Sequence, residues 1–432
     1  MKGKQQLITL WFIYLCFSPL PLQAKPTEII FWHSLAGHLG EQIQLIANGF
    51  NKSQTEYRIK PIYKGNYIES LTSFAAAFRA HQPPSMVQVF EVGKDSMLIP
   101  QGIIKPVHEL MEEEGMTLPL SSFFPAIRAY YSEHNKLMAM PLNTSIPVMV
   151  YDVMALASVG YSGDSFPSTW DELEVLANKL RQRGFRCAYT STYPAWILIE
   201  SFAALHGLTM TDASHQKATY NSQAIITHLA RLRRWQREHY FEHGGRSDDA
   251  TVLFTSGRCP LISQSSGAFN SVKQLVTFPV AMAPIPLDKE VSVTRFNNVT
   301  GGAAIWVVNG QNPLVYRGIA RFFVYLARPD VQQQWHQNTG YLPLGMSGEY
   351  HELAHLSQHP SLLLAQHELA SKEHPTHITQ IAAQNQIRII NDEALEMIFA
   401  GIKSPRLAMN DAVTRADHAI SRFRKNTSSH GQ

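Results

Sequence analysis

The stretch from Glu28 to Gly93 alternates between strand-like and helix-like patterns, and this alternation limits the fold more than any other feature of the sequence. Three apolar runs are typical of strands, and the segments between them have helical spacing: strands are predicted at 28–32, 57–63 and 86–90, and helices at 39–50 and 67–78. This order predicts an α/β fold with a parallel sheet. Ligands of such sheets bind beyond the carboxyl ends of the strands, where Tyr67, Glu91 and the loop at His33 lie.

A second unit of the same kind follows the first. Pro141 and Pro147 bracket a polar segment, which suits a stiff connection between two lobes. Thr169 and Glu172 form a capping-box pattern at the start of a helix, and Gly184 is placed to end it. Without its first 24 residues the chain has 408 residues (432 − 24), which is more than one ordinary core accommodates, so we expect two domains.

The chain begins like an exported protein. Lys2 and Lys4 precede an apolar stretch at 8–17, and Ala24 provides the small residue of a signal-peptide cleavage site. That stretch is shorter than the ~20 residues that span a bilayer, and no later stretch is long enough, so we expect a soluble periplasmic protein cleaved after Ala24. Cleavage removes two lysines and lowers the formal charge from +3 to +1 (3 − 2), which argues against nucleic acid or an anionic membrane as a partner.

Two cysteines remain after that cleavage, Cys187 and Cys259. An exported compartment permits a disulfide between them. Two buried thiols are an equal alternative, because both states suit the interior of a protein.

A Gly-Gly pair, Gly301-Gly302, stands between a polar run and the strand-like segment 303–308. It has two interpretations. The pair is either a tight turn or strand bulge, or a bare backbone whose N–H groups approach a ligand because no Cβ intervenes.

One motif of the chain resembles that of an enzyme. His351, Glu352 and His355 match H-E-x-x-H, in which two histidines bind zinc and the glutamate acts as a base. The usual third-ligand spacing does not follow, although Glu368 and Glu373 are available. We therefore interpret the motif as a solvated helix face and keep a zinc hydrolase as an alternative.

Several other side chains have both a structural and a functional interpretation. Glu91 is either a hydrogen-bond acceptor for a hydroxylated ligand or a general base, although no nucleophile accompanies it in the sequence. Arg388 has apolar neighbours and pairs either with a structural carboxylate or with an anionic ligand. Tyr193 and Trp196 are core residues or one wall of a binding cleft.

Eight short stretches, spread over the mature chain, resemble the periplasmic solute-binding proteins of ABC importers, in particular those for sn-glycerol-3-phosphate. The stretches are Phe31-Trp32-His33-Ser34, 63–67, 88–93, Thr169-Trp170-Asp171-Glu172-Leu173, Ser265-Ser266-Gly267, Gly301-Gly302-Ala303, 335–343 and Gln386-Ile387-Arg388. The chain departs from the family pattern at Tyr193, where the family has a second tryptophan beside that of Trp196. The region 344–375 follows no family pattern.

This resemblance implies a two-lobe periplasmic binding protein fold with the ligand cleft between the lobes. It assigns 25–143 and 291–328 to lobe 1, and 144–290 and 329–432 to lobe 2. It implies ligand contacts from seven residues, namely Tyr67, Glu91, Ser145, Ser265, Gly302, Tyr341 and Arg388, with Tyr193 and Trp196 as a possible wall.

The implied function is capture of glycerol-3-phosphate and glycerophosphodiesters, such as glycerophosphocholine, for the membrane permease and ATPase subunits of an ABC importer. We expect a monomer that catalyses no reaction and holds no cofactor or metal. A receptor for neutral oligosaccharides is the alternative within binding proteins.

Overall fold

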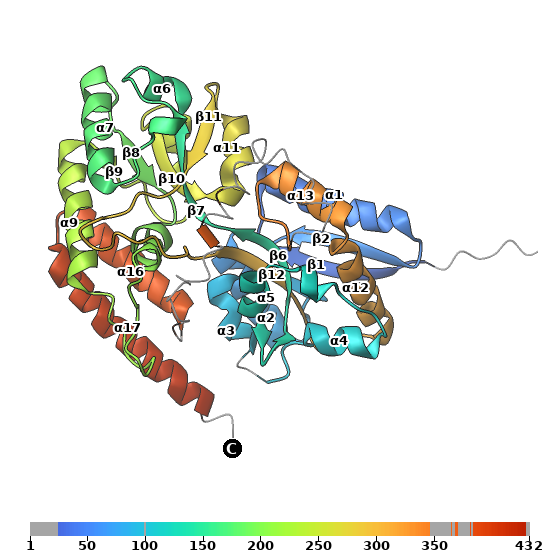
Figure 1. The fold of residues 1–432 in the computed structure, drawn as a ribbon. Coiled ribbons are helices and arrows are strands. Elements are labelled where there is room, and N and C mark those ends of the chain that lie inside the picture. The colour runs from blue at the N-terminus through green and yellow to red at the C-terminus, as the bar shows by residue number, and fades with distance from the viewer. Residues whose placement is uncertain are drawn as a thin grey trace, which may run out of the picture.

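The computed structural model describes residues 25–98, 101–345, 364, 368–369, 381 and 383–428. These residues form two lobes side by side, each built around a five-stranded sheet (Figure 1). The expected signal peptide, residues 1–24, lies outside the described residues. No helix in the described part of the chain has both the length and the apolar character needed to cross a membrane.

The sheet of the first lobe has the strand order β2-β1-β3-β12-β6. Its strands are β1 (Thr27–His33), β2 (Tyr57–Tyr63), β3 (Met86–Phe90), β12 (Gly301–Val307) and β6 (Met140–Ser145). The predicted parallel pairing is confirmed for β1 with β2 and for β1 with β3. By contrast, β12 runs antiparallel to both β3 and β6, because the chain re-enters this sheet from the other lobe.

Helices on this first sheet bury its apolar side chains. They include α1 (Gly37–Ser53), α2 (Tyr67–Arg79), α4 (Val107–Glu113), α12 (Pro313–Leu326) and α13 (Pro329–Thr339). Phe31 from β1, Trp306 from β12 and Phe322 from α12 share one core with almost no exposed surface. This core positions the ends of β3, β6 and β12 at the edge of the lobe that faces its neighbour.

The second lobe is built on a mixed sheet with the order β11-β7-β10-β8-β9. Its strands are β7 (Pro147–Asp152), β8 (Tyr189–Ser191), β9 (Phe241–Glu242), β10 (Leu261–Ser265) and β11 (Val280–Ala283), and its main helices are α7 (Trp170–Arg183), α9 (Gln223–Glu238), α11 (Phe269–Leu275), α16 (Gln384–Phe399) and α17 (Pro405–Ser428). The predicted capping box of α7 is confirmed, since Thr169 Oγ1 accepts a bond from the Glu172 N–H and Glu172 accepts one from the Thr169 N–H. Gly184 ends the helix with a φ of 109°.

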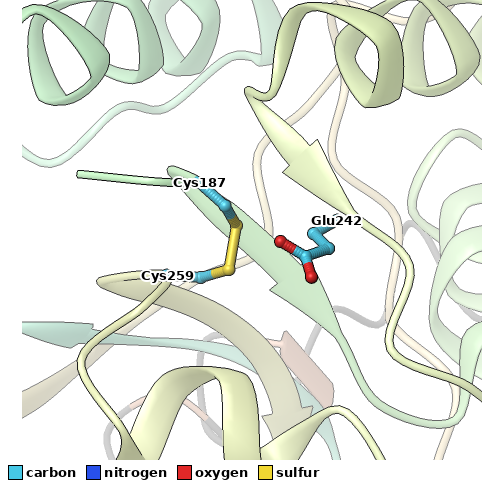
Figure 2. A group of neighbouring side chains, drawn as sticks. All are labelled: Cys187, Glu242 and Cys259. Carbon is cyan, nitrogen blue, oxygen red and sulfur yellow. A yellow bond between two sulfur atoms is a disulfide. The ribbon is translucent and has the colours of Figure 1, made fainter. Parts of the chain in front are cut away.

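The two cysteines of the mature chain form a disulfide. Cys187 lies just before β8 and Cys259 just before β10, and both are buried (Figure 2). Glu242 lies beside them, and its carboxylate accepts a bond from Arg258 Nε at 2.7 Å. The disulfide thus ties two neighbouring parallel strands together at the ends where they begin.

The stiff connection predicted between Pro141 and Pro147 is the shortest crossing between the lobes. β6 ends at Ser145 and β7 begins at Pro147, so that Ile146 alone separates them. A longer crossing, residues 284–300, leads back from β11 to β12.

The expected boundary at residue 329 is wrong for the segment that includes α13. Trp335, Tyr341 and Leu344 belong to the core of the first lobe, where the ring of Trp335 stacks on that of Tyr341. α13 also packs against α1 and α12 (Figure 1). Its apolar side complements the first sheet, which the spacing of the sequence does not reveal. The other lobe boundaries stay a prediction.

Candidate functional site: a cavity between the lobes

A cavity of about 580 Å³ is lined by residues from both lobes. All nine residues predicted for the ligand site line it: Tyr67, Glu91, Ser145, Tyr193, Trp196, Ser265, Gly302, Tyr341 and Arg388. They are as much as 321 residues apart (388 − 67) in the sequence, and each comes from a different helix, strand or loop. Their convergence is a property of the fold, and their contact with a ligand stays a prediction.

The Gly301-Gly302 pair is a place of close approach, and it is regularly paired with Ser145 and Thr144 of β6. The shift in register between β12 and β6 comes after the pair, between Ala303 and Ala304, where Leu142 of β6 is the extra residue. Gly302 has a φ of +120°, and a Cβ there would lie 1.7 Å from the main-chain oxygen of Asn143. A Cβ on Gly301 would lie 2.5 Å from the ring of Trp196. Glycine is therefore required at both positions, and the N–H of Gly302 donates to Glu91 Oε2 at 3.2 Å on the cavity wall.

Arg388, on α16, pairs with two carboxylates. Its Nη1 donates to Glu91 Oε1 at 2.7 Å, and its Nε and Nη2 donate to the two oxygens of Glu200 at 3.0 and 2.7 Å. Of the two interpretations of Arg388, pairing with a carboxylate of the protein is thus the one seen in the structure. The bidentate pair with Glu200 also fixes the plane of the guanidinium, with Nη1 turned toward the other lobe.

Glu200 is one residue of this cluster that the sequence analysis missed. It is 4% exposed and belongs to the π-helix η4, Ala195–Ser201, a rare form that is frequent at functional sites. The available signal was one acid within the otherwise apolar run 195–205, because a carboxylate in such a run needs a partner.

Burial shifts the titration of this cluster. Desolvation raises the pKa of Glu91, and the charge and hydrogen bond of Arg388 oppose that rise only in part. Burial by itself would lower the pKa of Arg388, but Glu200 and Glu91 together raise it, so the guanidinium stays charged. The cluster therefore holds two carboxyl groups and one fixed positive charge.

The first lobe contributes a set of oriented hydroxyl and amide groups. Asn143 Nδ2 donates to the hydroxyl of Tyr67 at 3.0 Å, and Asn143 Oδ1 accepts a bond from Gln88 Nε2 at 2.8 Å. The ring of Tyr67 stacks on Phe90 with centroids 5.3 Å apart. Neither Asn143 nor Gln88 was predicted for the site, and both act by positioning the hydroxyl of Tyr67.

The aromatic pair of the second lobe is both core and wall. Trp196 is 4% exposed and packs in the core of that lobe, and it also lines the cavity with Tyr193. The two rings meet edge to face, with centroids 6.3 Å apart. Tyr193 has a φ of +42°, which is costly for a bulky residue and is typical of functional sites.

The zinc interpretation finds no support among the described residues. The motif at 351–355 and Glu373 lie outside them. Glu368, one candidate third ligand, is buried and accepts bonds from Arg295 Nη1 at 2.8 Å and Asn298 Nδ2 at 3.2 Å. Within the described part of the chain, the one group with metal-like spacing is Cys187, Glu242 and Cys259, and its two sulfurs are bonded to each other (Figure 2).

Comparison with known proteins agrees with this architecture. Residues 46–347 match the model of the bacterial extracellular solute-binding proteins. The chain belongs to this family. The membership assigns it a binding role outside the cytoplasm and accords with a cavity between two lobes.

Two relatives and two solved structures are similar to this chain over most of its length. The sn-glycerol-3-phosphate-binding periplasmic protein UgpB of Yersinia pseudotuberculosis is 34% identical over 92% of this chain and 93% of its own, and that of Escherichia coli strain UTI89 is 33% identical over 93% and 94%. The structure of UgpB from Mycobacterium tuberculosis in complex with glycerophosphocholine has a TM-score of 0.75 at 19% identity, covering 91% of this chain and 98% of that one. The GacH receptor of Streptomyces glaucescens has a TM-score of 0.76 at 15% identity over 92% and 99%. The expected two-lobe binding-protein fold is confirmed.

Proposed function

We propose that this protein captures sn-glycerol-3-phosphate and glycerophosphodiesters for an ABC importer. The observation that carries the proposal is the meeting of all nine predicted ligand residues in one cavity between the lobes. The names of the relatives, which cover more than nine-tenths of the chain, support the same class of ligand.

The cavity contains the donors that a phosphate group requires. Arg388 offers a charged donor, the main chain of Gly302 offers an N–H, and the hydroxyls of Ser145 and Ser265 line the same space. Glu91 now accepts bonds from two of these donors, Arg388 Nη1 and the Gly302 N–H. Its carboxylate thus stands where a phosphate would bind, and an entering phosphate would take over both donors.

This exchange gives the two carboxylates different roles. Glu200 keeps the Nε and Nη2 edge of Arg388, so the guanidinium holds its orientation while Nη1 turns to the phosphate. Glu91, released, accepts hydrogen bonds from the glycerol hydroxyls. Tyr67 and Tyr341 offer further hydroxyls to the ligand from the same wall.

The protein acts by binding alone, as a monomer that delivers its ligand to permease and ATPase subunits, after removal of a signal peptide at Ala24. The expected closure of the lobes on the ligand is a hinge motion. Scattering profiles that are identical with and without saturating ligand would contradict it.

A thermal-shift panel tests the function. A ligand that binds only the folded state raises the melting temperature. We expect glycerol-3-phosphate and glycerophosphocholine to raise it and maltose to leave it unchanged. A shift with maltose alone would instead identify a receptor for neutral oligosaccharides.

A further inference from the structure

The second-lobe wall of the cavity carries a carboxylate that pairs with no cation in the part of the chain that the structure describes. Asp392 lies one helical turn beyond Arg388 on α16, on the face of that helix that lines the cavity. Its Oδ1 accepts a bond from the main-chain N–H of Ala195 at 3.2 Å. Among the described residues, the Asp392 side chain forms no other hydrogen bond and no ion pair, which leaves its second oxygen open.

The nearest cations are already engaged. Arg388 is held by Glu91 and Glu200, and Arg246 makes two bonds, of 2.6 and 2.7 Å, with Glu396. Burial raises the pKa of Asp392 to about 6, so its carboxylate is mostly charged at neutral pH. A partly buried charge that pairs with no cation among the described residues is unfavourable by itself and identifies a candidate functional site.

A second acid and two aromatic rings line the same cavity, and the Tyr193 N–H donates to the main-chain oxygen of Ser247, the neighbour of that acid. Asp248 is exposed, lines the cavity and has no ion-pair partner among the described residues. Ala195, the donor to Asp392, directly precedes Trp196, whose ring forms the wall with that of Tyr193. Uncompensated carboxylates next to aromatic faces are the chemistry that recognises an organic cation.

Resting on the proposed function, we propose that Asp392, with Asp248 at the rim, binds the ammonium group of a glycerophosphodiester headgroup. A primary ammonium, as in glycerophosphoethanolamine, gains more from Asp392 than the quaternary ammonium of glycerophosphocholine. The reason is hydrogen bonding: a primary ammonium donates three hydrogen bonds, and the methyl groups of choline donate no strong one. The negative charges of Asp392 and Asp248 also favour zwitterionic diesters over glycerol-3-phosphate. They repel its phosphate, which can carry two negative charges.

Calorimetry with Asp392→Asn tests this assignment. We expect glycerophosphoethanolamine to lose at least about tenfold in affinity and glycerophosphocholine about threefold, because only the first loses a charge-assisted hydrogen bond. Glycerol-3-phosphate should bind as before or more tightly. Glu393→Gln is the matched control: it removes a charge from the next residue of α16, which pairs with Arg415 and does not line the cavity. It should leave all three affinities unchanged.

A second test compares two ligands of the wild-type protein, so its result does not depend on whether a variant folds. Glycerophosphoethanolamine should bind at least about tenfold more tightly than glycerophosphoglycerol, which has a neutral headgroup of similar size. Equal affinities for these two diesters, or equal losses of all three ligands in Asp392→Asn, would overturn the inference while leaving the proposed function in place. Binding of none of these phosphates by the wild-type protein would overturn both.

Discussion

The two walls of the cavity differ in kind. The first-lobe wall offers hydroxyl and main-chain groups at strand ends, such as the Tyr67 hydroxyl and the Gly302 N–H. The second-lobe wall offers charges on α16, where Arg388 and Asp392 line the cavity, and Glu200 of η4 pairs with Arg388 without lining the cavity itself. The difference suggests a division of labour: both walls bind the phosphate that all glycerophosphates share, and the second wall also distinguishes the charges of their headgroups.

The largest effect should come from the cation of the second wall. Arg388→Gln removes the one lysine or arginine among the described residues that line the cavity, and it leaves Glu91 and Glu200 buried without their cation. Because uncompensated buried carboxylates repel an anion, we expect about a 100-fold loss of affinity for every phosphate ligand, measured by calorimetry.

Arg246→Gln provides the control for this change. It breaks a similar pair with Glu396 outside the cavity and should leave affinity unchanged. If Arg388→Gln kept its affinity within about threefold, the arginine would have only a structural role.

The next effect concerns the stability of the fold, because it tests whether the second wall holds a charge that opposes folding. Asp392 has a folded pKa of about 6, above its usual value, so its ionised form opposes folding. Asp392→Asn should therefore raise the free energy of unfolding by about 2 kcal/mol at pH 7.5. The gain should shrink as the pH falls through 6 and vanish below about 4, where Asp392 is protonated in both states.

Urea unfolding of both proteins across pH 4–8 measures this gain. A variant that is less stable than the wild type at pH 7.5 would show that Asp392 supports the fold. In that case the second wall would not store an uncompensated charge.

The aromatic part of the second wall should have a smaller, ligand-dependent effect. Trp196→Ala removes the better face for a cationic headgroup, and a cation–π contact contributes about 1 kcal/mol. We expect about a fivefold loss for glycerophosphocholine and a smaller loss for glycerol-3-phosphate. Calorimetry with both ligands decides: equal losses would remove the aromatic wall from the recognition of the headgroup.

The smallest effect should come from a neutral group of the first wall. Tyr67→Phe removes one hydroxyl that Asn143 positions, and a neutral hydrogen bond is worth about 1 kcal/mol or less. The loss should be about threefold and alike for glycerol-3-phosphate and both zwitterionic diesters. A loss confined to one of these ligands would contradict the division between the walls.

The same two walls show what the sequence alone could predict. The alternation of strands and helices predicted the first sheet, and strand ends pointed to Tyr67 and Glu91 because the carboxyl ends of parallel strands share one edge. Gly302 was recognisable by residue type, since a missing Cβ permits close approach.

The second wall could not be derived in this way. Glu200 and Arg388 are 188 residues apart and meet only because η4 packs against α16. Asp392 was missed for the same reason: its lack of a cation is visible only once the partners of Arg388 and Arg246 are known. Similarly, no spacing in the sequence shows that Trp335 packs in the first lobe.

We propose that one phosphate bridges the two walls. The position of phosphorus in a crystal structure of the complex with glycerophosphocholine tests it most directly. We expect the phosphate oxygens to accept hydrogen bonds from both Arg388 and the Gly302 N–H, with Glu91 turned away from the guanidinium. A phosphate bound elsewhere, or a Glu91 that keeps both donors while ligand is bound, would contradict the account.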